Sequence, residues 1–118
     1  MNKNEMIVLA LGVGSAAHSL PNADVYTEKG DANYIKLREM IDDEFRRVDA
    51  DLLDTGPGSE LRQDKLLNQL EEAEADQNEA IMTQTKVVLE AVARYAPDAA
   101  AALKKTPEEL EAVAAQIG

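Results

Sequence analysis

The interval between Gly58 and Pro97 contains neither glycine nor proline, and this absence most constrains what the chain can fold into. Both residues interrupt helices, so an interval without them favours helix wherever apolar residues recur three or four positions apart. Leucine, isoleucine and valine recur in this way here, and we expect one helix over 59–96. A break near Asp76 is the alternative, because Asp76 and Glu79 have the spacing of a capping pair.

A second long helix is expected before it. Asp31 is a plausible N-cap, and the run of turn-forming residues at 54–58 should end the helix near Leu53. Apolar residues at intervals of four, three and four, the alternation of a coiled coil, form its stripe: Ile41, Phe45, Val48 and Leu52. A connection this short makes helices antiparallel neighbours, so we predict a helical hairpin of 31–53 against 59–96.

Two short helices should follow Pro97. The first is the alanine-rich segment 98–105. The second has the clearest local signal in the chain, since Thr106 can cap it, Pro107 suits the first helical position, and Glu109 can reach back to the cap. The predicted fold class is therefore all-α.

The first thirty residues differ in composition from the rest. Residues 6–20 are apolar, a stretch of about fifteen residues where about 20 are needed to span a bilayer. A helix or strand buried against protein is the favoured interpretation, with a cleaved signal peptide or a membrane anchor as alternatives. Pro21 and Asn22 then begin a connector. We divide the chain into an apolar N-terminal segment with its connector, 1–30, and an acidic helical domain, 31–118.

Charge and composition exclude several classes of function. The chain has 23 Asp and Glu residues against 12 Lys and Arg, a net charge of -11. Direct binding of nucleic acid by phosphate neutralisation requires the opposite sign. Cysteine is absent, which removes disulfides and thiolate chemistry. Aromatic residues make up only 3%, so stability should come from long helix seams or from neighbouring subunits.

No set of residues has the pattern of a reaction centre. Residues 12–17 have the spacing of a dinucleotide fingerprint, but no parallel sheet can follow, and small residues there instead permit close helix packing. His18 has no acidic or metal-ligating neighbour in the sequence. Asp49, Asp51 and Glu60 have the spacing of a calcium loop that lacks its glycine. We expect no catalytic residue, no cofactor and no metal site, and therefore no enzyme.

The favoured function is a structural or assembly protein that acts through protein contacts, as a homo-oligomer or in a larger assembly. A virion-type component, such as a connector, internal or scaffold-like protein, would suit such a chain, in the cytoplasm or within a particle rather than secreted. The expected apolar contact residues are Ile7, Val8, Leu9, Leu11, Ile41, Phe45, Val48 and Leu52.

Two alternatives remain. The first is an acidic inhibitor or regulator that binds a basic partner surface, with these candidate contacts: Asp42, Asp43, Glu44, Glu71, Glu72 and Glu74. The second is an exported or membrane-tethered helical protein, in which residues 6–20 contact the membrane.

Overall fold

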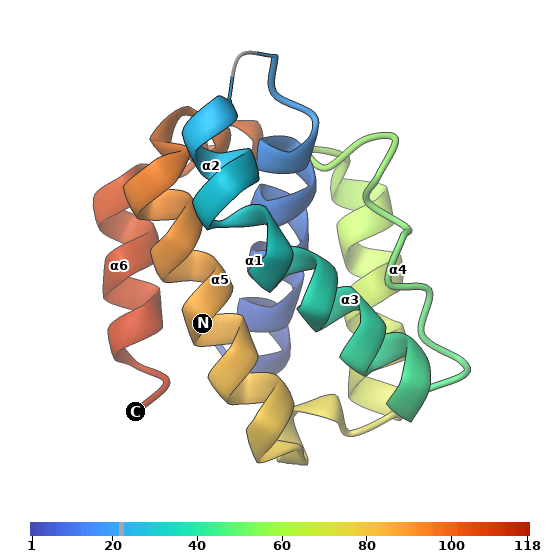
Figure 1. Ribbon diagram of the computed structural model, residues 1–118. Helices are drawn as coiled ribbons and strands as arrows, with labels where there is room; N and C mark the ends of the chain where they lie inside the picture. The colour runs from blue at the N-terminus through green and yellow to red at the C-terminus, as the bar shows by residue number, and fades with distance from the viewer. Residues whose placement is uncertain (22) are drawn as a thin grey trace.

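The computed structural model describes residues 1–21 and 23–118, and this part of the chain contains helices and loops without a strand. The predicted all-α class is confirmed. The helices surround a central one and leave no long hairpin standing apart (Figure 1). In chain order the elements are α1 (Lys3–His18), α2 (Asp24–Lys29), α3 (Asp31–Glu44), α4 (Glu60–Glu72), η1 (Ala75–Gln77), α5 (Glu79–Tyr95), η2 (Pro97–Leu103) and α6 (Pro107–Ala115).

The central element is α1, the apolar segment of the sequence. It contacts α3, α4, α5 and η2, which lie on different sides of it (Figure 1). A helix that is apolar all round is stable only when it is covered all round, and nearly every residue from Met6 to Ala17 is buried. The expected burial against protein is thus confirmed, and the covering protein is this chain itself. No helix in the described ranges is both long and apolar enough to cross a membrane.

Glycines allow this close covering of α1. A Cβ atom on Gly12 would lie 2.6 Å from Leu103 Cδ2, and one on Gly14 would overlap the ring of Tyr34. Both partners pack directly on the bare backbone of α1, which confirms that the small residues at 12–17 serve helix packing. The segments 1–30 and 31–118 share one hydrophobic core.

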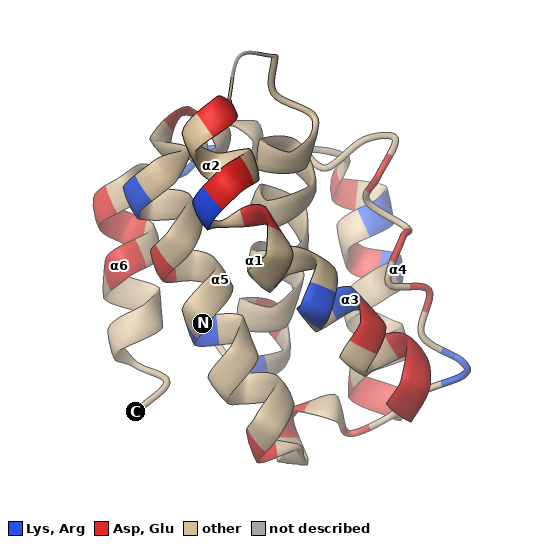
Figure 2. Ribbon diagram, viewed as in Figure 1, with Lys and Arg blue, Asp and Glu red and all other residues tan. Residues whose placement is uncertain are grey.

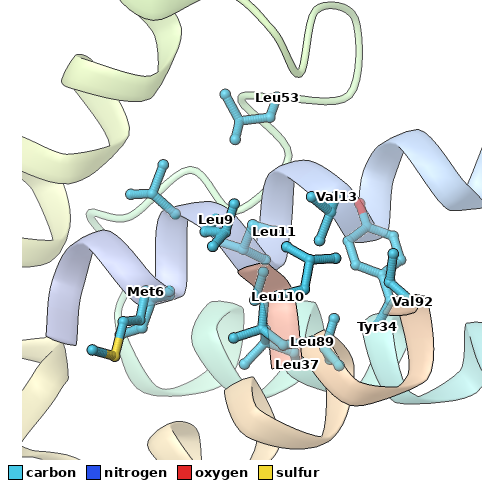
Figure 3. Close-up of a cluster of buried hydrophobic side chains, with 14 of the residues drawn as sticks. Met6, Leu9, Leu11, Val13, Tyr34, Leu37, Leu53, Leu89, Val92 and Leu110 are labelled. Carbon is cyan, nitrogen blue, oxygen red and sulfur yellow. The ribbon is translucent and has the colours of Figure 1, made fainter. Parts of the chain in front are cut away.

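Every other helix contributes side chains to the core around α1, as does the loop after α3. Figure 3 shows Met6, Leu9, Leu11 and Val13 of α1 beside residues from the other elements. Every side chain labelled there is at most 4% exposed. The other elements contribute Tyr34 and Leu37 from α3, Leu53 from the following loop, Leu89 and Val92 from α5, and Leu110 from α6.

The predicted end of the second helix is wrong. α3 ends at Glu44, and Phe45 has extended backbone angles of φ -130° and ψ 97°. The last turn of α3 carries three consecutive acids and no basic residue, which opposes the helix dipole. Beyond α3, Val48 and Leu53 belong to a loop, and their side chains are still buried in the core. The apolar residues predicted to form a helical stripe are therefore buried without being helical.

The predicted continuity of 59–96 is also wrong. α4 ends at Glu72, Glu74 adopts a left-handed conformation with φ 52°, and α5 begins at Glu79. The acidic run between the helices has few apolar side chains to hold it against a core. The alternative of a break is correct, but its cap is Asn78, whose side-chain oxygen accepts a hydrogen bond of 3.0 Å from the Ile81 amide. The turn brings α5 back over α1, α3 and α6.

Smaller local predictions had mixed outcomes. Ser59 and Thr106 are N-caps as expected, and the capping box of Thr106 and Glu109 is complete. Asp31 does not cap α3, because it is the first helical residue and Gly30 precedes it. The predicted connector contains the short helix α2, while Asn22 lies outside the described residues. The alanine-rich segment is a 3₁₀-helix.

Replacing Gly14 by alanine should destabilise the fold. The added Cβ atom would meet the Tyr34 ring, whose Cγ lies 2.9 Å away, and overpacking of this kind typically costs about 1–3 kcal/mol. This exceeds the roughly 1 kcal/mol that alanine gains over glycine within a helix. We expect a net loss of up to about 2 kcal/mol in the free energy of unfolding, measured by urea denaturation.

Gly56→Ala is the matched control. A Cβ atom there finds its nearest neighbours at 3.7 Å, and the expected change is neutral or slightly stabilising. A Gly14→Ala protein as stable as Gly56→Ala would contradict the close packing of α1 on α3.

Candidate functional site

The apolar residues proposed as partner contacts lie mainly inside the molecule. The four from α1, namely Ile7, Val8, Leu9 and Leu11, are at most 7% exposed. Ile41 and Val48 are also buried, and Phe45 and Leu52 are half-buried against the same core. These side chains contact their own chain in the structure and present no continuous apolar surface to another protein.

The acidic residues proposed as contacts are all exposed. Three of them, Asp42, Asp43 and Glu44, form the last turn of α3. Glu71 and Glu72 form the last turn of α4, and Glu74 follows in the linker. Figure 2 shows acidic segments at the C-terminal ends of both helices. We name these six residues the acidic pole.

The acidic pole opposes the electrostatics of the helices that carry it. The C-terminus of a helix bears a partial negative charge, and an acid there is unfavourable by roughly 0.3–1 kcal/mol. Neither α3 nor α4 has a basic residue in its last turn. Among the described residues, none of the six carboxylates lies within 4.0 Å of a basic side chain. No ion pair in the described part of the chain therefore offsets the charge of these six carboxylates.

Glu74 adds backbone strain to this arrangement. Its φ of 52° lies in the left-handed region, which costs a side-chain-bearing residue about 1–2 kcal/mol. Glycine or asparagine would be the common choice at such a position. The chain instead places a third carboxylate beside those of Glu71 and Glu72.

A polar network fixes the loop between α3 and α4. The Tyr34 hydroxyl donates a hydrogen bond of 3.1 Å to Asp54 Oδ1, and Arg38 forms an ion pair of 3.1 Å with Asp54 Oδ2. Ser15 of α1 donates to the Leu53 carbonyl and to Asp54, each at 3.4 Å. The network ties the loop to the two helices beneath it, and its role is structural.

A second polar contact was missed by the sequence analysis. His18 Nδ1 lies 2.8 Å from Asp31 Oδ1, so the histidine does have an acidic partner. The two residues are 13 positions apart, and α2 lies between them in the chain. Their contact therefore could not be predicted from local sequence spacing. Ser15 hydrogen-bonds to Leu53 and Asp54 of the loop and not to His18. Ser15, His18 and Asp31 therefore do not form a catalytic triad. No group of three or more potential metal ligands occurs among the described residues.

Two buried polar atoms have no protein partner. The Tyr26 hydroxyl is fully buried, and the Asn4 side-chain oxygen is also enclosed, yet neither hydrogen-bonds to another described residue. Burial raises the pKa of Tyr26 well above its ordinary value. Burial also raises the pKa of Tyr34, with the Asp54 charge acting in the same direction and the Arg38 charge opposing it.

Comparisons with known proteins add no relative to this description. No family model, no curated protein and no solved structure matches the chain.

The two buried tyrosines should respond oppositely to loss of the hydroxyl. Tyr34→Phe removes a hydrogen bond to a carboxylate and should lower the free energy of unfolding by about 1 kcal/mol or more. Tyr26→Phe removes a buried hydroxyl without a protein partner, so it should be neutral or stabilising by up to about 1 kcal/mol. Urea denaturation of both variants would measure the difference, and equal losses would contradict the assignment.

The same tyrosines predict a loss of stability in alkali. The unfolded chain releases its phenolic protons near pH 10, whereas the fold retains them because both pKa values are raised. The unfolded state then binds fewer protons, so the free energy of unfolding should fall as the pH rises above about 10. Tyr26→Phe should reduce this fall. An unchanged pH profile in that variant would contradict the prediction.

Proposed function

We propose that this protein is a non-enzymatic helical interaction domain whose acidic pole binds a basic surface of a protein partner. The observation that supports the proposal is the charge of the acids at the ends of α3 and α4, placed where it lowers helix stability. Residues that oppose stability without a local partner are expected at functional surfaces.

The overall charge acts in the same direction. A net charge of -11 steers a basic partner toward the molecule, and the negative ends of two helices add to the field near the pole. The same charge makes two copies of the chain repel each other. This leaves the homo-oligomeric assembly hypothesis with less support than the binding of a basic partner.

The residues on which the assembly hypothesis depended are also not available for contact with another chain. The apolar contacts of that hypothesis are mostly buried within the chain. The large apolar side chains that remain exposed among the described residues do not share an element: Met1 precedes α1, and Val25, Ile35 and Leu61 lie on α2, α3 and α4. We therefore favour the acidic binding domain over a virion-type connector or scaffold.

Charge reversal at the pole should weaken binding of a basic probe. The triple variant D42K/E44K/E71K removes three exposed acids and adds three lysines without touching the core. With an oligolysine peptide as probe, we expect Kd at low salt to rise at least about tenfold. Isothermal titration at several salt concentrations would measure both Kd and its salt dependence.

The control is a triple variant with the same change in net charge. E28K/E108K/E111K alters exposed acids of α2 and α6, outside the pole. It should weaken oligolysine binding much less than the first variant does. If the two variants weaken binding equally, only the net charge matters and the acidic pole is not a binding surface.

A further inference from the structure

A groove lies between α1, α4 and η2. Its apolar part is formed by Val8 and Leu9 of α1, Leu67 of α4 and Leu103 of η2, and its volume is about 260 Å³. Leu67 and Leu103 are half-buried there, so the groove keeps part of its apolar surface open to solvent. The remaining lining residues are Met1, Glu5, Gln63, Asp64 and Lys105.

We propose that this groove receives the apolar side chains of a basic amphipathic helix that belongs to the protein's partner. The proposal rests on the proposed function, and it assigns a chemistry to the partner: apolar residues on one face of a helix, with lysine or arginine beside them. Helices bind in apolar grooves through anchors spaced three or four residues apart.

The size of the groove favours side chains over a whole small molecule. Pockets for small-molecule ligands usually have volumes of about 300–1,000 Å³ and enclose most of the ligand. A groove of about 260 Å³ is smaller, and it is partly open to solvent. It can hold a few aliphatic side chains whose backbone stays outside.

The charges along the groove select a basic helix. Asp64 lines the groove, and Glu71 lies seven residues after it on the same ridge of α4. Glu60, four residues before Asp64, lies 4.0 Å from Lys104, which offsets its charge. Glu5 lies on the α1 side. Lys105 also lines the groove, but it lies 3.9 Å from Glu109, which offsets its charge.

The ridge of acids also connects the groove to the acidic pole. Glu71 is the last acid of the ridge and the first acid of the pole on α4. A basic helix seated in the groove would therefore extend toward the pole. A second copy of this chain does not fit the same description, because each copy carries a net charge of -11.

The test uses two synthetic probes with equal numbers of lysines. One is an amphipathic helical peptide of leucine and lysine, and the other is oligolysine, which lacks the apolar face. Leu67→Gln should raise Kd for the leucine–lysine peptide about tenfold, as loss of an anchor contact does, and should leave Kd for oligolysine unchanged. Ile35→Gln, on α3 outside the groove, should change neither value.

A measurement on the unaltered protein guards against misfolding of the variant. In methyl NMR spectra, the leucine–lysine peptide should shift the signals of the four groove residues, and oligolysine should not. Shifts confined to other methyl groups, or an unchanged Kd for Leu67→Gln, would overturn the proposal. The same shifts on concentrating the free protein would identify a second copy as the occupant, which would also overturn it.

The outcomes separate this proposal from the proposed function. If pole reversal weakens oligolysine binding while Leu67→Gln has no effect on either peptide, the acidic domain stands and the groove proposal fails. If neither peptide binds the unaltered protein, both fail. The groove proposal is supported only when leucine in the probe and Leu67 in the protein are both needed.

Discussion

Burial of the apolar residues of α1 on all sides is the constraint on which the rest of the structure depends. Its apolar side chains point in every direction around the helix axis, so no single neighbour can cover them. Most of the remaining helices therefore pack one face on α1 and expose the other to water, while α6 packs on α5. Gly12 and Gly14 let two of these neighbours approach the backbone of α1 closely.

This arrangement explains where the charge accumulates. The inner faces of α3, α4 and α5 are used by the core, so their acids lie outward or at the helix ends. The outward positions need no further explanation, because solvated acids are the common way to keep a small domain soluble. The acids at the helix ends do need an explanation, because acidic residues at the C-terminus of a helix lower its stability.

The sequence predicts local features better than it predicts tertiary ones. The caps at Ser59 and Thr106 depend on a few adjacent residues, and both are confirmed. The end of α3 at Glu44 depends on a loop whose buried side chains look like a continued helical stripe. Periodicity cannot tell these two structures apart. It also cannot tell a core residue from an interface residue, which is why Ile7 was expected at a partner contact and is found in the core.

The exposure of the acidic residues could be expected from the sequence because it hardly depends on the fold. An unpaired carboxylate is too costly to bury, so almost any fold leaves it at the surface. What the sequence could not give is the placement of two separate acidic runs at the ends of two helices, with an apolar groove on the ridge that leads to one of them. Exposure comes from each residue alone, whereas a binding surface comes from how the helices around α1 bring such residues together.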